Sequence, residues 1–222
     1  KYRNCDGVVI ASVDFSDPAV LKLIASEIPT VSLDFVYDNR TSVVSDNIGG
    51  ISALVHYIYE MGHRRIAFIH GEDTSVTQKR LISFRKTCAS LGISVPDYYV
   101  KPALYHDPKL SGLATRELLT LSDRPTCILY PDDFSFIGGM NELERQGISI
   151  PEDMSVAGYD GILLSQVLRP RLTTYHQNAE AMGCEAAAKL VELIEQPKTS
   201  LPQQIMVSGQ LLKGDTVRNI ND

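Results

Sequence analysis

The chain has 222 residues, of which 44% are hydrophobic and 22% are charged, and it contains no tryptophan. This composition supports one large globular domain or two small ones, and it excludes a disordered, collagen-like or coiled-coil protein. The formal net charge of −6 argues against a general nucleic-acid-binding surface, because such a surface needs basic residues to meet phosphates. No apolar stretch approaches the ~18 to 20 residues of a membrane span.

Short β-rich runs alternate with helical patterns along the whole chain. The expected strands lie at residues 7–11, 29–34, 42–45, 66–69, 126–130, 155–159 and 204–212. The expected helices lie at residues 48–61, 81–91, 110–121, 136–143 and 179–194. Gly62, Gly92 and Gly147 are expected to end three of these helices. This alternation with short connections predicts parallel strands with helices on both faces of the sheet.

The candidate ligand-binding residues follow from this fold class. Ligands of open α/β sheets bind at the carboxyl ends of the strands, so the residues directly after each strand are the candidates. Many of them are acidic or small and polar: Ser12, Asp34, Asp46, Asn47, Gly71, Pro131, Asp132, Asp133, Asp160 and Gly161. Arg80 near a helix start is either a salt-bridge residue or a bidentate ligand contact. Tyr105 either packs or covers the face of a ligand ring.

The chain carries no motif that predicts catalysis or a metal site. It has no P-loop, no glycine-rich dinucleotide fingerprint, no zinc-protease helix and no nucleophile elbow. The adjacent Asp132 and Asp133 could form an acid/base pair, but one helix cap and one ligand or solvent contact explain them better. The five histidines and four cysteines are scattered, so we expect no metal, no cofactor and reduced thiols typical of a cytoplasmic protein.

Several segments in order resemble the lactose/galactose-repressor family of bacterial transcription regulators. They are residues 43–50, 62–69, 125–133, 148–160 and 171–174, together with the Arg80-x-x-x-Phe84 motif and the helix that carries Met182-Gly183. The strongest match is residues 148–160, which read ISIPEDMSVAGYD. Each motif alone is weak, but the ordered set is specific and the resemblance covers essentially the whole chain.

The resemblance implies two similar α/β lobes with a sugar-sized effector between them and three chain crossings. One lobe would consist of residues 1–69 and 176–204, and the other of residues 70–175 and 205–222. The crossings would then fall near residues 70, 175 and 207. The resemblance thus implies a two-lobe, periplasmic-binding-protein-like fold in which each lobe has a parallel sheet flanked by helices.

The resemblance also implies roles for individual residues. Arg80 corresponds to the family arginine that contacts the effector, and Asp160 to the aspartate that accepts ligand hydroxyls. Asp132 matches a position where the family often has asparagine, and Tyr105 falls where an aromatic side chain often stacks on the ligand. The other lobe is expected to contribute three residues: Ser12, Asp34 and Asp46.

Three departures from the family pattern carry expectations of their own. Ser83 stands where glycine is usual, and Asp132-Asp133 replaces the usual asparagine-aspartate, so an acidic pocket should prefer hydroxyl-rich or cationic ligands. Residues 1–10 resemble the family's third strand and its approach. The DNA-reading helix-turn-helix and roughly two strand-helix units therefore have no counterpart, which predicts a truncated chain with an incomplete N-terminal lobe and an exposed apolar strand edge.

The prediction is therefore the effector-sensing region of a cytoplasmic, homodimeric, DNA-binding regulator, and not an enzyme. A sugar-like effector would close the lobes and change operator binding by a DNA-reading domain outside this chain, without a cofactor, a metal or a membrane partner. Two other hypotheses stay open. One is a periplasmic sugar-binding protein of a transporter, and the other is an enzyme that uses Asp132, Asp133 or Asp160 as acid or base.

Overall fold

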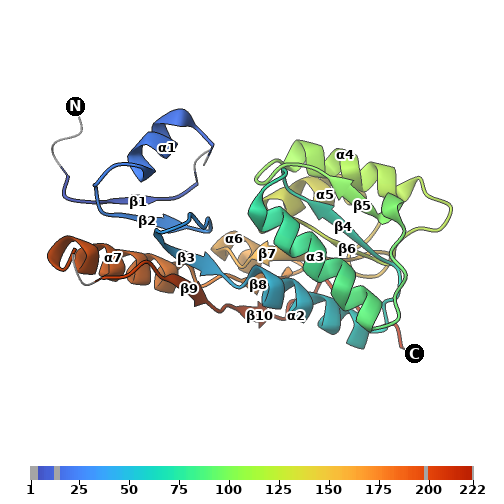
Figure 1. Ribbon diagram of the computed structural model, residues 1–222. Coiled ribbons are helices and arrows are strands. Elements are labelled where there is room, and N and C mark those ends of the chain that lie inside the picture. The colour runs from blue at the N-terminus through green and yellow to red at the C-terminus, as the bar shows by residue number, and fades with distance from the viewer. Residues whose placement is uncertain (1–4, 13–15, 198–199, 222) are drawn as a thin grey trace. The chain divides into compact units, whose positions relative to one another are not determined.

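The computed structural model describes residues 5–12, 16–197 and 200–221. The chain forms two compact units, one made of residues 1–46 and 178–208 and the other of residues 47–177 and 209–222. Each unit is built around its own sheet, with four strands in the first and six in the second (Figure 1). None of the helices in the described ranges is both long and apolar enough to span a membrane.

Unit 1 is a parallel sheet covered by one long helix. Its strands, in spatial order, are β1 (Val8–Ile10), β2 (Thr30–Leu33), β3 (Thr41–Ser45) and β9 (Gln204–Val207). The helix α7 (Ala179–Glu195) packs Met182 and Ala186 against Val31 and Val43 of the sheet. The short helix α1 (Pro18–Ile24) begins at an Asp17 cap and buries none of its residues. The core of this unit therefore lies between α7 and the central strands.

Unit 2 is a six-stranded sheet in the order β10-β8-β7-β6-β4-β5. These strands are β4 (Ile66–His70), β5 (Val100–Pro102), β6 (Cys127–Leu129), β7 (Ser155–Asp160), β8 (Thr173–His176) and β10 (Gln210–Leu212). The helices are α2 (Asn47–Glu60), α3 (Ser75–Ser90), α4 (Pro108–Leu119), α5 (Asp133–Arg145) and α6 (Leu163–Val167), with a 3-10 turn at Asp97–Tyr99. All strand pairs are parallel except β10 with β8.

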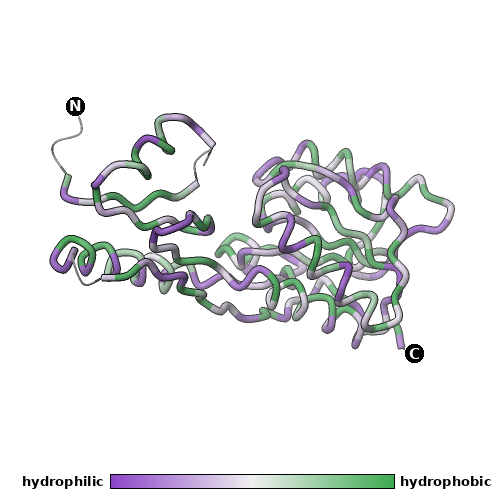
Figure 2. Tube along the Cα trace, in the orientation of Figure 1, coloured by the Kyte–Doolittle hydropathy of each residue, from purple (hydrophilic) through white to green (hydrophobic). Residues whose placement is uncertain are grey.

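Both faces of the unit 2 sheet are buried, which explains the continuous apolar runs of its strands. Ile66 and Phe68 of β4 point into a core formed with α2 and α3. Ala67 and Ile69, which alternate with them, point into a second core formed with α4 and α5. The helices are amphipathic, and hydrophobic and hydrophilic residues alternate along α4 (Figure 2). This architecture confirms the predicted parallel sheet with helices on both faces.

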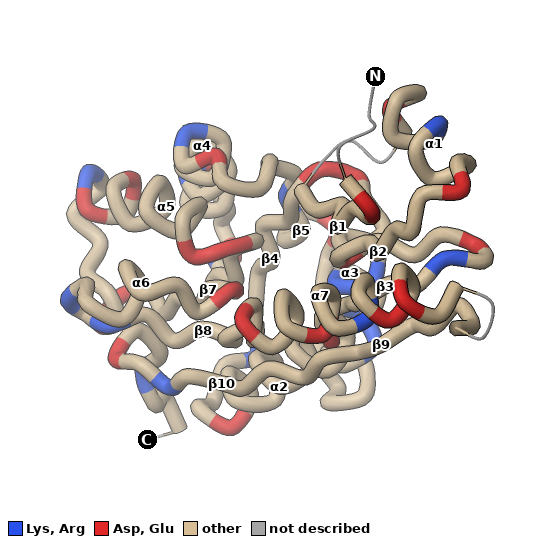
Figure 3. Tube along the Cα trace, turned by 90° about the vertical axis from the view of Figure 1, so that its left-hand side faces the viewer, with Lys and Arg blue, Asp and Glu red and all other residues tan. Residues whose placement is uncertain are grey.

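The helices α4 and α5 pack closely because glycines face each other at the contact. A Cβ atom on Gly138 of α5 would overlap the carbonyl oxygen of Pro108 in α4, so this position tolerates only glycine. At the solvent side, Glu142 accepts bonds from Arg116 at 3.0 Å and from Arg145 at 2.6 Å. Basic and acidic residues accordingly lie together on these two helices (Figure 3).

The C-terminal segment is fastened to the start of β4 by a buried histidine. One ring nitrogen of His63, Nδ1, lies 2.9 Å from Oγ1 of Thr126, and the other, Nε2, lies 3.1 Å from the carbonyl oxygen of Arg218. Burial lowers the pKa of His63, so the ring is held neutral in this position. The preceding Gly62 has φ = 96°, which confirms the predicted left-handed end of α2.

The structure differs from the predicted elements at several places. The predicted strand over residues 204–212 is two strands, β9 and β10, which belong to different sheets. The predicted lobe boundary near residue 69 also lies later than the division seen here, because α2 and β4 pack within unit 2. The periodicity missed α1, β5, α6 and β8, which are only three to seven residues long. Residues 1–4 of the predicted N-terminal approach lie outside the described residues.

Candidate functional site

In unit 2, polar residues gather where the parallel strands end. Asp160 is the last residue of β7, Asp132 follows β6, and Tyr105 follows β5. Because these strands are parallel, their carboxyl ends share one edge of the sheet, where ligands of this fold class bind. The sequence predicted these three residues as ligand contacts, and the structure places them at this common edge.

Asp132 is the N-cap of α5, so the helix cap that the sequence predicted for the Asp132-Asp133 pair is its first member. Its Oδ1 atom accepts a hydrogen bond of 2.7 Å from the backbone N–H of Ser135, and Oδ2 accepts one of 2.9 Å from the N–H of His106. The side chain is 1% exposed. The helix N-terminus favours the negative charge, so the carboxylate is held rigidly at the edge of the sheet.

Asp160 is a partly buried carboxylate on strained backbone. Its φ angle of 103° is rare for a residue other than glycine, and such strain is concentrated at functional sites. Its Oδ1 accepts a 2.5 Å hydrogen bond from Nε2 of Gln177. Burial raises the pKa of Asp160 to about 6; the charge of Asp132 acts in the same direction, and that of Arg80 opposes them. Burial therefore outweighs the charge of Arg80 and disfavours the ionised form of Asp160.

Arg80 of α3 reaches the same edge but is buried by the protein. Its Nε donates a hydrogen bond of 2.7 Å to Oδ1 of Asn47, and its Nη1 donates one of 2.9 Å to the carbonyl oxygen of Pro131. The guanidinium carbon lies 3.6 Å from the centre of the Tyr159 ring. Stacking and two hydrogen bonds fix the guanidinium plane, so Arg80 presents a fixed charge beside Asp160.

Tyr105 is packed into the protein more than the sequence indicated. Its hydroxyl lies 2.9 Å from Oγ1 of Thr77, and its backbone N–H donates a 2.8 Å hydrogen bond to Oε2 of Glu72. A Cβ atom on Gly71 would overlap the ring, so the glycine makes room for it. The alternative of simple packing, which the sequence left open for Tyr105, accounts for these contacts.

Asp133 holds the loop after β7 in place. Its Oδ1 accepts a 2.6 Å hydrogen bond from the hydroxyl of Thr174 in β8, and its Oδ2 accepts a 2.9 Å hydrogen bond from the N–H of Ile162. Burial raises its pKa to about 7. Asp132 and Asp133 therefore have separate roles, one as a helix cap and one as an internal link to the segment that follows Asp160.

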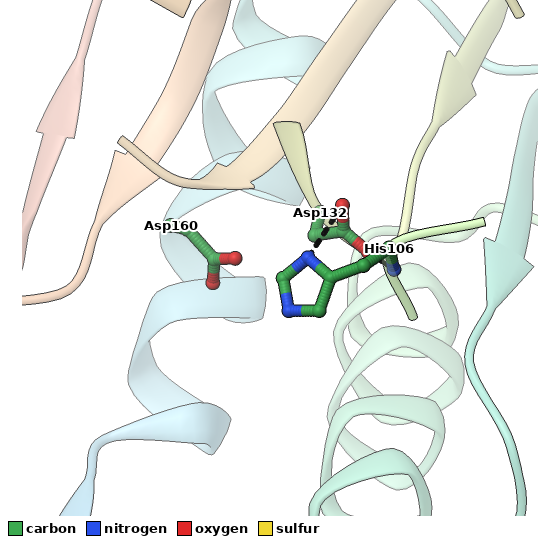
Figure 4. A group of neighbouring side chains, drawn as sticks. All are labelled: His106, Asp132 and Asp160. Carbon is green, nitrogen blue, oxygen red and sulfur yellow. Dashed lines mark hydrogen bonds and ion pairs between the residues drawn. The ribbon is translucent and has the colours of Figure 1, made fainter. Parts of the chain in front are cut away.

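The sequence analysis missed His106 and Gln177 at this edge. The ring of His106 points toward the same space as Asp160, and its Nδ1 lies 3.6 Å from Oδ1 of Asp132 (Figure 4). The donor atoms of His106, Asp132 and Asp160 lie within 4.8 Å of one another, a grouping that could hold a cation. Both missed residues follow strands, β5 and β8, that the periodicity did not reveal. Recognising those strands would have marked them as candidates.

The three candidates of unit 1 lie at the carboxyl edge of its own sheet. Asp34 directly follows β2, Asp46 directly follows β3, and Ser12 lies two residues after β1. Ser12 and Asp34 have positive φ angles of 53° and 55°. The Oδ1 atom of Asp34 accepts a 2.8 Å hydrogen bond from the N–H of Ser45. Their predicted contact with a ligand stays a prediction.

Comparisons with known proteins place this arrangement in context. Residues 55–217 match the family described as periplasmic binding protein-like domain. The chain is 30% identical over 219 residues to the probable HTH-type transcriptional repressor ExuR of Bacillus subtilis (strain 168), covering 97% of this chain and 65% of that protein. The chain spans 65–66% of the length of the curated relatives it matches first.

Solved structures give the same picture. A putative transcriptional regulator LacI from Bacillus cereus subsp. cytotoxis NVH 391-98 superposes with a TM-score of 0.87 at 28% identity, covering 96% of this chain and 77% of that one. A complex of the transcriptional regulator CelR with cellobiose superposes with a TM-score of 0.88 at 26% identity, covering 97% and 67%. These findings confirm the resemblance to the lactose/galactose-repressor family that the sequence motifs indicated.

Proposed function

Since the chain belongs to the periplasmic binding protein-like domain family, we propose that it senses a small effector, a sugar or a related polyol, for a DNA-binding transcriptional regulator. The observation that carries this proposal is the edge of unit 2, where Asp160, Asp132 and the guanidinium of Arg80 converge. Carboxylates accept hydrogen bonds from hydroxyl groups, and a fixed guanidinium donates them. The carbohydrate in the complex of the similar regulator CelR supports a sugar-sized ligand of this chemistry.

The regulatory part of the proposal rests on the relatives. Those named above are transcriptional repressors or regulators, which favours a regulator over the periplasmic sugar-binding protein of a transporter. We propose that operator DNA binds to a part of the regulator outside the sensing region, since the net charge of −6 does not suit phosphate binding here. Homodimerisation, cytoplasmic location and ligand-driven closure of the lobes belong to the same proposal.

The proposal excludes turnover of the effector. None of the relatives named above is described as an enzyme. The buried Asp133 is bonded to Thr174 and Ile162 and serves the fold instead of a reacting atom. Turnover of a bound sugar by the intact protein, abolished in Asp133→Asn, would contradict this part of the proposal.

The decisive experiment measures ligand and operator binding on the full-length regulator. Isothermal titration calorimetry with a panel of mono- and disaccharides finds the effector, and fluorescence anisotropy with operator DNA is then repeated with and without it. We expect a change in operator affinity of at least tenfold. Asp160→Asn should weaken effector binding by about 1.5 to 3 kcal/mol, the value of a charge-assisted hydrogen bond lost in a buried site. A bound effector that leaves operator affinity unchanged would refute the regulatory role.

A further inference from the structure

The edge of unit 2 is rich in hydrogen-bond acceptors and negative charge. One carboxylate oxygen each of Asp132 and Asp160 and one ring nitrogen of His106 lie within 4.8 Å of one another (Figure 4). Two of these three groups are anionic when ionised, and Asp132 adds its negative charge to the surroundings of Asp160. A ligand at this edge therefore meets more acceptors than donors.

A buried amide oxygen beside Asp160 independently calls for a donor. The side-chain Nε2 of Gln177 donates a hydrogen bond to the carboxylate of Asp160, and the backbone N–H of Gln177 donates one of 3.1 Å to the carbonyl oxygen of Asp160. These two bonds fix the orientation of the side-chain amide. The Oε1 atom of Gln177 is buried and accepts no hydrogen bond from the described residues. A buried polar atom without a partner costs free energy, so a donor on a ligand would stabilise it.

The guanidinium of Arg80 does not offset the effect of burial on the carboxyl of Asp160. Arg80 is directed by its hydrogen bonds toward Asn47 and Pro131, and it lies flat over Tyr159. Burial together with the charge of Asp132 outweighs it and raises the pKa of Asp160 to about 6. A positive charge on the ligand would stabilise the ionised carboxylate of Asp160, whereas a carboxylate or phosphate would destabilise it further.

We infer that the effector carries an ammonium group, as an amino sugar does, and that Asp132 and Asp160 bind it while the amide oxygen of Gln177 accepts a hydrogen bond from one of its N–H groups. This inference rests on the proposed sensing function. An ammonium nitrogen offers three donors, and two acceptors at about 2.8 Å from it stand roughly 4.6 Å apart. The metal-ligating atoms of Asp132, Asp160 and His106 lie within 4.8 Å of one another, which accommodates this separation. A bare metal ion is the other source of positive charge, and its ligands, at roughly 3.4 Å from one another, satisfy the same limit, so the experiment below distinguishes the two.

The test compares sugars that differ only in charge. The full-length protein is titrated calorimetrically at pH 7 in EDTA with glucosamine, glucose and glucuronate, and with the three corresponding galactose derivatives. At least one amine is expected to bind ten times or more tightly than its neutral analogue, and each uronate to bind more weakly than its neutral analogue. Neutral sugars or uronates that bind as tightly as the amines would overturn the inference and leave the proposed function standing.

A variant that keeps the helix cap tests the charge. Asn caps helices as well as Asp, so Asp132→Asn keeps the cap of α5 at Ser135 and removes one negative charge, together with the acceptor for the N–H of His106. We expect it to reduce the amine preference at least fivefold. The matched control is Asp107→Asn at the N-cap of α4, where the carboxylate accepts a 2.9 Å bond from the N–H of Leu110, and it should keep the preference. An unchanged preference in Asp132→Asn would overturn the inference.

Two further outcomes separate the inference from its premise. If neither the six sugars nor the wider panel of mono- and disaccharides binds, the proposed sugar-sensing function is refuted and the inference falls with it; if only a neutral or acidic sugar of the wider panel binds, the inference alone is overturned. If an amine binds only when Mn²⁺ replaces EDTA, and His106→Ala abolishes that binding, the positive charge belongs to a metal ion and the assignment to an ammonium group is overturned.

Discussion

The buried carboxyl of Asp133 should make the protein less stable as the pH rises from about 4 to about 7. Its pKa of about 7 in the folded chain lies above the value of 3.8 for an unperturbed aspartate, because burial disfavours the charge. The unfolded chain therefore releases this proton first as the pH rises, and the free energy of unfolding falls between about pH 4 and pH 7. At 1.36 kcal/mol per pKa unit, the shift from 3.8 to about 7 corresponds to at most about 4 kcal/mol.

Asp133→Asn removes the charge and keeps the shape of the side chain. The amide oxygen can still accept from the N–H of Ile162, and the hydroxyl of Thr174 can rotate to accept from the amide nitrogen. We expect the variant to be more stable than the native protein at pH 8, by up to about 4 kcal/mol, and to lose this advantage by pH 4.

Urea unfolding at pH 4, 6 and 8 measures this difference directly. The control is Asp97→Asn, since the side chain of Asp97 is 94% exposed and its ion pair with Arg85 is solvated. Its difference from the native protein should change little with pH. Parallel pH profiles for the native protein and Asp133→Asn would refute the argument, because they would mean that the carboxyl of Asp133 titrates alike in the folded and unfolded chains.

Other substitutions test the packing of α4 against α5, the loss of stability at acidic pH and the role of the Arg80 guanidinium. Gly138→Ala should lower the free energy of unfolding by more than about 2 kcal/mol, because backbone of α4 occupies the space a methyl group needs. Gly183→Ala, where nothing lies within 4 Å, should raise it by about 0.5 to 1 kcal/mol, and equal effects at the two sites in urea would contradict this view. Since burial lowers the pKa of His63, the native protein should lose stability as the pH falls below 6.5, and His63→Gln should flatten this loss in thermal unfolding unless other groups cause it. Arg80→Lys cannot make both hydrogen bonds and the stacking contact, so calorimetry should show effector affinity reduced at least tenfold; native affinity would rule out a role for the guanidinium plane.

The sequence predicted the long, strongly patterned elements well. The helices α2, α4 and α7 lie where the apolar spacing indicated them, because each buries one continuous stripe of side chains. The short elements were missed for the opposite reason. The strand β8 reads Thr-Thr-Tyr-His and has no apolar run. It nevertheless lies inside the sheet between β7 and β10, and three of its four residues are buried.

The division into units could not be predicted from local pattern. Residues 66–70 form a strand by composition, but only their pairing with β6 and β5 assigns them to unit 2. The same holds for residues 204–212, where β9 pairs with β3 of unit 1 and β10 pairs with β8 of unit 2. Strand pairing depends on residues far away in the chain, so apolar spacing alone does not reveal it.

The candidate site shows the same limit at the level of single side chains. Reading residues after strands found Asp132 and Asp160, because the rule depends only on where a strand ends. The rule did not show that the guanidinium of Arg80 is buried against Tyr159, since that contact joins α3 to β7. It also missed Gln177, whose significance comes from a hydrogen bond to Asp160 across neighbouring strands.

One structural device recurs in both units and explains why aspartates occupy strand ends here. Asp34 after β2 and Asp160 at the end of β7 both have positive φ angles, 55° and 103°. In each case the carboxylate accepts a hydrogen bond from the neighbouring parallel strand or the residue after it, from Ser45 in one unit and Gln177 in the other. The left-handed conformation turns the carboxylate along the edge of the sheet, where it fixes the end of the next strand. Aspartate tolerates this conformation better than most residues, so both its backbone and its charge suit the position. The two aspartates then differ in what their neighbours leave unsatisfied. The partner of Asp34 is a backbone N–H, whereas the partner of Asp160 is an amide whose oxygen is still without a donor among the described residues. That difference supports the proposed ligand binding at the edge of unit 2 more strongly than a strand-end aspartate alone could.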